Sequence, residues 1–145
     1  MKTLRTLTLS LGLIFMAGML YAQEPMKAEK YDNPQWYYIV SVDYAPGKYD
    51  QAKKFIEDYF IKASEKAGTS GPVMALEMNS GTYDAMYIWH MKDGLDEMNW
   101  KTTADDVEWF KAMAELAGGQ EKAQEIWQEY QSLVSSSKAE LARKL

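Results

Sequence analysis

The apolar and polar positions of the chain alternate with two different periods, and these periods predict its secondary structure. Residues 36–45 are dense in aromatic and β-branched side chains, which favours a strand, and the breakers Pro46 and Gly47 follow. In residues 49–67 the apolar side chains recur every three or four positions, as on one face of a helix. Gly68 is placed to end that helix.

Residues 73–78 and 82–91 predict two more strands, because both are rich in apolar and aromatic side chains and a polar turn separates them. Asn79-Ser80-Gly81 supplies residues that are typical of turns. If Ser80-Gly81 forms a two-residue turn, the predicted register pairs Leu76 with Ala85 and Met74 with Tyr87.

The last third of the chain predicts a short helical piece at residues 95–100 and two longer helices. Thr103 and Asp106 resemble a capping box at the start of the first helix, and Gly118-Gly119 separates it from a second helix at about residues 120–134. The tail, residues 135–145, suits either a helix or a terminal edge strand.

In this order, the elements predict a single α+β domain at residues 35–145. The expected fold is a ferredoxin-like antiparallel sheet with helices on one face. Both sides of the predicted strands are largely apolar, yet the helices cover only one side. The other side holds Tyr37 and Ile39 in the first strand and Met86 and Ile88 in the third. A second copy of the sheet is the simplest cover for such a surface.

The strands WYYIVSV and TYDAMYIWHM, with the element order over residues 36–145, resemble those of the dimeric α+β barrel superfamily. The resemblance implies a homodimer in which two ferredoxin-like sheets pack around a cavity. Members of that superfamily include cofactor-independent monooxygenases, haem-degrading enzymes and proteins of unknown role. No motif in this chain selects one of these activities, so the resemblance carries over no catalytic residue and identifies no cofactor.

Residues 1–22 have the three-part layout of a secretory signal peptide. Lys2 and Arg5 precede an apolar run at residues 7–20, and Ala22 ends the segment. The run is shorter than the ~20 residues that a membrane span needs. We therefore expect cleavage after Ala22 and export to the periplasm or the cell exterior.

The polar leader, the net charge and the lack of cysteine limit the classes of partner that the exported chain can bind and the ways in which its fold can be stabilised. Residues 23–34 are polar and predict a flexible leader. The chain has a net charge of −5, and no basic stripe is present, which argues against nucleic acid and anionic membranes as partners. There is no cysteine, so an apolar core rather than disulfides must stabilise the fold.

His90 is the single histidine, and it falls on the second side of the predicted sheet, near Tyr37. The residue type suits a general base, or a ligand for haem iron or another metal. The alternative is a partly buried, hydrogen-bonded histidine with no chemical role. One histidine without cysteine excludes the common zinc sites.

Asp43, Glu77 and Asp84 are predicted to lie at one end of the sheet and on one face. Three neighbouring carboxylates would suit a hard cation or acid–base chemistry. The alternative is a set of three solvated charges at the sheet edge.

These observations favour a binding function and leave two alternatives open. We expect a small apolar or aromatic ligand in the dimer cavity, contacting Tyr37, Ile39, Met86, Ile88 and His90. One alternative is an enzyme of the cofactor-independent monooxygenase or haem-degrading kind, with His90 as base or ligand. Another is a structural domain that binds a different protein through the same face.

Overall fold

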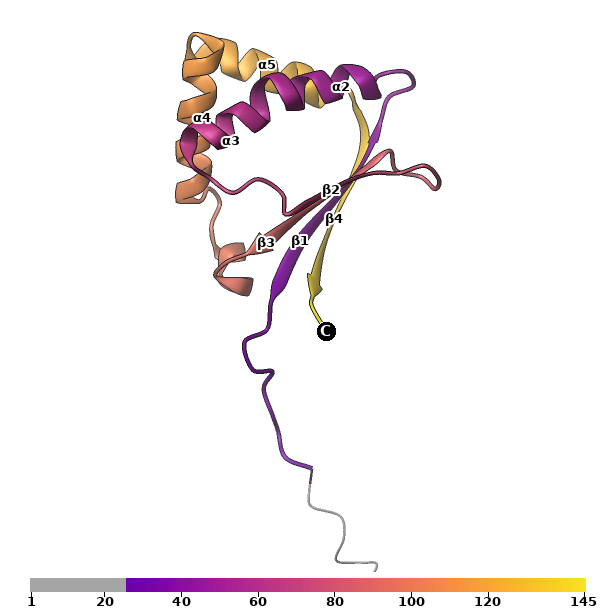
Figure 1. Cartoon of the computed structure of the whole chain (residues 1–145), viewed down its shortest axis with the longest axis vertical. Helices are drawn as coiled ribbons and strands as arrows, with labels where there is room; N and C mark the ends of the chain where they lie inside the picture. The colour runs from indigo at the N-terminus through magenta and orange to yellow at the C-terminus, as the bar shows by residue number, and fades with distance from the viewer. Residues whose placement is uncertain (1–25) are drawn as a thin grey trace, which may run out of the picture. The chain divides into compact units, whose positions relative to one another are not determined.

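The computed structural model describes residues 26–145, so the predicted signal peptide lies outside the described residues. The chain divides into two compact units, residues 1–32 and residues 33–145. Residues 26–32, the described part of the first unit, contain neither helix nor strand. The second unit is an α+β domain, with helices on one face of a four-stranded antiparallel sheet (Figure 1).

The sheet has the strand order β2-β3-β1-β4, and every neighbouring pair is antiparallel. One helical segment connects the first two strands and another connects the last two, which is the ferredoxin-like arrangement that the sequence predicts. The tail of the chain is therefore a strand and not a helix. The four strands are β1 (Trp36–Tyr44), β2 (Met74–Glu77), β3 (Ala85–Met91) and β4 (Val134–Arg143).

The predicted helix at residues 49–67 forms as one continuous segment of three parts. It comprises α2 (Tyr49–Phe55), a π-helical stretch η1 (Ile56–Phe60) and α3 (Ile61–Ala67). Gly68 ends the segment with a φ of 67°, a left-handed conformation that glycine adopts without steric cost. Hydrophobic periodicity does not distinguish a π-helical stretch from an α-helix of this length.

The second helical layer begins after a short 3-10 helix, η2 (Gly94–Asn99). Helix α4 (Ala104–Ala117) starts with the predicted capping box: the Thr103 Oγ1 accepts from the Asp106 N–H at 3.1 Å, and the Asp106 Oδ2 accepts from the Thr103 N–H at 2.8 Å. Helix α5 (Gln120–Ser132) follows directly and leads into β4.

The described residues form two apolar clusters. One lies where β1 and β3 meet α2 and the end of α5, around Val42, Tyr44 and Leu133. The other lies between the helices, where Met113 packs against Ala63, Ala112 and Ala123. Small alanines let α3, α4 and α5 approach closely, and Met113 fills the space that remains.

The predicted register of the β2–β3 hairpin is wrong by one residue. Leu76 pairs with Met86 and Met74 pairs with Ile88, because residues 78–84 form a longer connection than a two-residue turn. The Met78 N–H donates to the Asp84 carbonyl at 2.8 Å, which closes that connection. Serine at the first position of a two-residue hairpin turn would need a positive φ, which is unfavourable for a residue with a Cβ.

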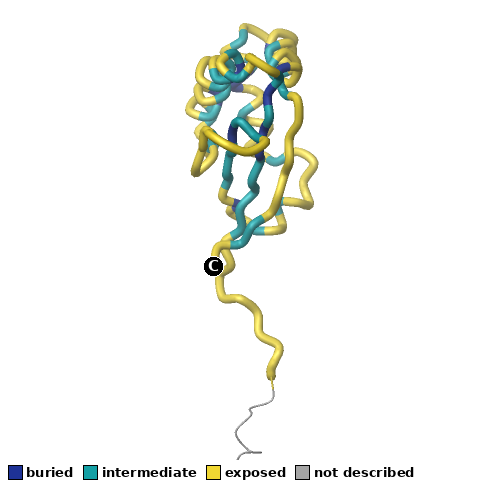
Figure 2. The backbone as a smooth tube through the Cα atoms, turned by 90° about the vertical axis from the view of Figure 1, so that its right-hand side faces the viewer, coloured by how far each residue is buried: buried dark blue, intermediate teal, exposed yellow. Residues whose placement is uncertain are grey.

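The helices lie on one side of the sheet and pack most closely near its Tyr44 end (Figure 1). Seen from the side in Figure 2, the strands face the viewer with no helix in front of them. None of the helices in residues 26–145 has the length and hydropathy needed to cross a membrane.

Candidate functional site

The candidate site is the face of the sheet opposite the helices, which we call the open face. Side chains alternate between the two faces of a strand, so the register fixes which residues share it. Tyr37 lies beside His90, and Ile39 lies beside Ile88. The one-residue shift in the hairpin moves two further apolar side chains of β2, Met74 and Leu76, onto this face.

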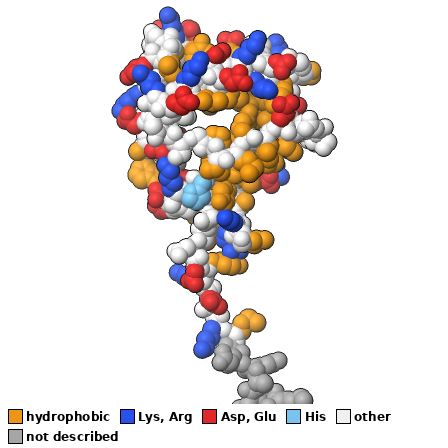
Figure 3. All heavy atoms as spheres, viewed as in Figure 1, with side chains coloured by type: hydrophobic (Ala, Val, Ile, Leu, Met, Phe, Trp, Pro, Cys, Tyr) orange, Lys and Arg blue, Asp and Glu red, His pale blue; other side chains and the backbone are white. Residues whose placement is uncertain are grey.

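The open face is largely apolar across three of its four strands. Its central row runs from Met74 through Ile88 to Ile39, and the next row runs from Leu76 through Met86 to Ser41. Met74 remains 50% exposed and Leu76 42% exposed. Hydrophobic side chains gather over the strands below the helical layer in Figure 3. All five residues predicted to contact a ligand therefore share one surface with Met74 and Leu76.

His90 lies near the end of this face, on β3. Its ring is 5.4 Å from the ring of Tyr37, centroid to centroid, at an interplanar angle of 54°. The side chain is exposed, and no hydrogen bond to it is found among residues 26–145. The single protomer therefore shows neither the burial nor the hydrogen bond of a histidine without a chemical role, and the role of His90 stays a prediction.

The fourth strand, β4, adds a polar border to the open face. Glu140 pairs with Ile39 and Lys138 pairs with Ser41, so both charges lie on the same face. The Lys138 Nζ is 2.8 Å from the Glu140 Oε1. This border adds one positive and one negative charge to a surface that is otherwise largely apolar, with Ser41 and Asp43 as polar residues on β1.

The predicted acidic cluster of Asp43, Glu77 and Asp84 does not assemble. Glu77 pairs with Ala85 in the row that faces the helices, and its Oε2 is 3.4 Å from the Lys53 Nζ, whereas Asp43 belongs to the open face. The Asp84 Oδ2 accepts the Tyr44 N–H at 2.9 Å. Within residues 26–145 no three His, Cys, Asp or Glu side chains are grouped to hold a metal ion.

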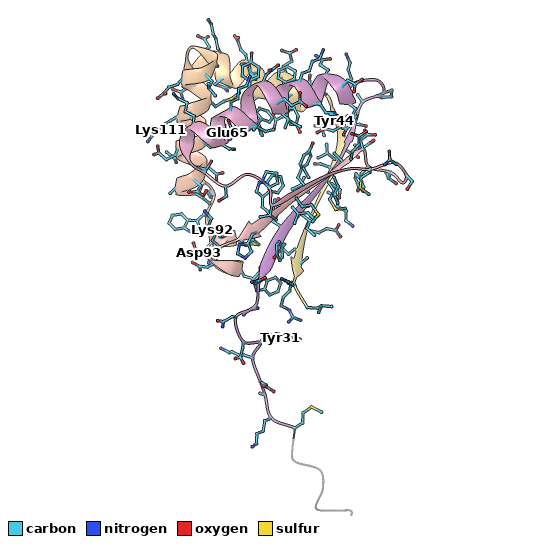
Figure 4. All side chains as sticks on the ribbon, viewed as in Figure 1. Tyr31, Tyr44, Glu65, Lys92, Asp93 and Lys111 are labelled. Carbon is cyan, nitrogen blue, oxygen red and sulfur yellow. The ribbon has the colours of Figure 1, made fainter. Side chains whose placement is uncertain are left out.

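A cluster of tyrosine hydroxyls on the covered face was not predicted from the sequence. The Tyr44 hydroxyl lies 2.9 Å from that of Tyr130 and 3.4 Å from that of Tyr87. Tyr44 is only 4% exposed and lies where the sheet meets the helices (Figure 4). A buried tyrosine hydroxyl needs a hydrogen-bond partner, and here one tyrosine from β1, one from β3 and one from α5 satisfy one another.

The surroundings of these tyrosines oppose ionisation. Burial raises the pKa of Tyr44, and its contacts with the hydroxyls of Tyr130 and Tyr87 raise it further. Burial also raises the pKa of Tyr87 and Tyr130. At the rim of the cluster, burial and a hydrogen bond to Glu77 raise the pKa of Tyr49 to about 12.

The variant Tyr44→Phe should lower the free energy of unfolding by about 1–2 kcal/mol, because it removes the central hydroxyl of the cluster. Unfolded tyrosines ionise near pH 10, whereas the folded protein holds these phenols neutral to higher pH. Their contribution is therefore present below about pH 10 and lost as the pH rises above it. Urea unfolding at neutral pH and at about pH 11 should show a shallower alkaline loss in Tyr44→Phe than in the wild type.

Tyr38→Phe is the matched control, because no residue of 26–145 makes a hydrogen bond to the Tyr38 hydroxyl while its ring also packs on the sheet, 6.4 Å from Trp89. Its stability should stay within about 0.5 kcal/mol of the wild type. Equal losses in the two variants would show that the hydroxyl cluster has no special role.

Comparisons with known proteins support the fold. No family model matches the chain, and no curated protein matches its sequence. The solved crystal structures that resemble it include NIPSNAP family and NIPSNAP-like proteins. A NIPSNAP family protein from Agrobacterium tumefaciens has a TM-score of 0.53 at 15% identity, and the match covers 83% of this chain and 95% of the A. tumefaciens chain.

Two further structures agree with the first. A second A. tumefaciens NIPSNAP family protein, of unknown function, has a TM-score of 0.52 at 14% identity and covers 81% of this chain and 94% of its own. An uncharacterised NIPSNAP-like domain protein from Burkholderia xenovorans has a TM-score of 0.52 at 12% identity. The match covers 77% of this chain and 85% of the B. xenovorans chain. At these identities the likeness shows an α+β fold shared with NIPSNAP family proteins and carries no activity to this chain.

Proposed function

We propose that this protein is an exported binding module, in which two copies pair through their open faces and enclose a small apolar or aromatic ligand. The observation that carries the proposal is the apolar surface on β1, β2 and β3, opposite the chain's own helices. Contiguous apolar surface that a protomer leaves uncovered often marks a binding surface or a subunit interface. The pairing would correspond to a dimeric α+β barrel.

The charged border of the open face supports a second copy as the partner. In a twofold interface the same patch meets itself, so each contact occurs twice with the roles exchanged. Lys138 and Glu140 supply opposite charges two residues apart on one face. Lys138 and Glu140 pair within one protomer, and in a twofold interface they can exchange partners with the same two residues of the second copy.

The side chains of the open face suit an apolar ligand in the space between the sheets. Packed sheets lie about 10 Å apart, which leaves room only where the facing side chains are short or adaptable. Met74 and Met86 have flexible thioether chains that fit irregular apolar shapes. Tyr37 and His90 provide aromatic rings and polar atoms at one end of the same surface.

The proposed location of the module is outside the cytoplasm. The layout of residues 1–22, a basic start followed by a short apolar run that Ala22 ends, supports a cleaved signal peptide. The mature protein would then begin at Gln23. The absence of cysteine suits either the periplasm or the cell exterior, because no free thiol is exposed to oxidation there.

Mass spectrometry of the protein purified from its own source tests the cleavage of residues 1–22, the pairing of two copies and the bound ligand together. Under native conditions we expect a dimer of chains that lack residues 1–22, together with an additional small mass that denaturation releases. A dimer without a released molecule would contradict ligand binding. A complex with a different polypeptide on the open face would support the structural alternative instead.

A matched pair of leucine variants assigns the released molecule to the open face. Leu76 on β2 is 42% exposed and Leu116 on α4 is 40% exposed, so the two positions differ in location and hardly in exposure. Leu76→Lys places a charge among the apolar rows and should abolish retention of the small molecule. Leu116→Lys should retain it, and loss from both variants would place the ligand elsewhere.

A further inference from the structure

We infer that protonation of His90 opposes pairing of the open faces, so that the dimer dissociates as the pH falls from neutral to mildly acidic. This inference concerns regulation and rests on the proposed function. It requires that a second copy covers the end of the sheet where His90 and Tyr37 lie. The pH dependence can be wrong while the proposed dimer is right, because a dimer can form without responding to pH.

The position of His90 is the first step of the argument. It is exposed in the protomer and projects from the same face as Ile88, two residues earlier on β3. Across the sheet its neighbour is Tyr37, whose ring lies 5.4 Å away. A sheet packed over the apolar rows of Ile88 and Ile39 would therefore remove water from the imidazole as well.

The direction of the effect follows from the cost of burying charge. An imidazole in water gains its proton at about pH 6.5, and an apolar cover disfavours the charged form unless an anion accompanies it. Pairing therefore favours neutral rings, and protonation favours the separated protomers. Each dimer buries two such rings, so the effect enters the dimer dissociation constant twice.

The charged neighbours of His90 do not neutralise it within the protomer. The facing residue on β1 is Tyr37, a phenol that is neutral in this pH range. The carboxylate of Glu140 on β4 is already paired with Lys138 at 2.8 Å. On η2, which packs against β1 and β3, Asp96 accepts from the Asn99 side chain and Glu97 accepts from the Asp93 N–H. Lys92, at the end of β3, pairs with Asp105 at 3.5 Å.

Carboxylates on the open face would produce an effect of the opposite sign. If pairing desolvated Glu140 or Asp43, protonation at lower pH would remove a buried charge and strengthen the dimer. His90 is the only histidine of the chain, so no other side chain is expected to weaken the dimer in this range. The α-amino group titrates near pH 8 and is present in every variant.

Analytical ultracentrifugation of the purified protein at about pH 8 and about pH 5.5 tests the inference. For the wild type we expect the dimer dissociation constant to rise clearly more than about threefold between the two conditions, because each dimer buries two rings. The variant His90→Gln keeps a polar side chain that does not titrate, and its dissociation constant should change less than about threefold over the same range.

The outcomes separate this inference from the proposed dimer. A protein that stays monomeric at about pH 8 contradicts both. A wild-type dimer that is equally tight at the two pH values, or tighter in acid, contradicts the inference and leaves the dimer in place. If His90→Gln loses affinity in acid as steeply as the wild type, another group is responsible and the assignment to His90 is wrong.

Discussion

The variant Ile88→Asp should convert the dimer into monomers, with a dissociation constant about 1000-fold above that of the wild type. Ile88 lies in the central row of the open face, between Met74 on β2 and Ile39 on β1. A carboxylate there would be buried twice in every dimer, without a cation on the neighbouring strands. A cost of about 2 kcal/mol for each copy gives a loss of this size. In the protomer position 88 lies on the open face and is only half-buried, so the fold should persist.

Ile61→Asp is the matched control for this experiment. Ile61 lies on α3, in the helical layer on the opposite side of the sheet, and is 48% exposed. The chemical change is identical, and the expected effect on the dimer is less than about threefold. Circular dichroism of both variants would establish that each is folded. If both variants dimerise like the wild type, the open face is not the interface.

The variant Met113→Ala should lower the free energy of unfolding by about 3 kcal/mol or more. Met113 is 1% exposed and is the largest side chain of the described residues that is fully buried. The other buried residues of its cluster, Ala63, Ala112 and Ala123, are short, so they cannot extend into the space that the truncation leaves. A cavity that does not collapse places the cost in the upper part of the usual range for such changes, about 2–5 kcal/mol.

Leu116→Ala, on the same helix, isolates the effect of burial. Leu116 is 40% exposed, and its truncation should cost less than about 1 kcal/mol. Urea unfolding of the two variants must be compared at one protein concentration, because dimerisation adds to the apparent stability. Equal losses would mean that the cluster between α3, α4 and α5 is not a packed core.

The element order, and with it the ferredoxin-like fold, could be predicted because each element has a clear local pattern. The strand at residues 36–45, the capping box at Thr103 and the stop at Gly68 depend on near neighbours in the sequence. The tail was ambiguous because three serines hide the alternation of β4. Its pairing with β1 comes from tertiary contacts, which place Ala139 beside Val40.

The hairpin register and the cluster of tyrosine hydroxyls could not be predicted, because both depend on tertiary contacts between residues that are distant in the sequence or on the exact length of a turn. The hairpin register was predicted from a two-residue turn, and the longer connection at residues 78–84 moved Met74 and Leu76 onto the open face. Tyr44 and Tyr130 are far apart in the chain, and only the packing of α5 on the sheet joins their hydroxyls. Five positions of the open face could nevertheless be predicted, since alternation along a strand fixes the face of each side chain.

Sedimentation equilibrium of the wild-type protein, at micromolar concentration and about pH 8, is the most direct test of the pairing of open faces. We expect the mass of two chains, with a dissociation constant below the protein concentration. A single species with the mass of one chain would show that the apolar rows of β1, β2 and β3 face water in the working protein. The enclosed ligand site and the histidine switch would then both be excluded.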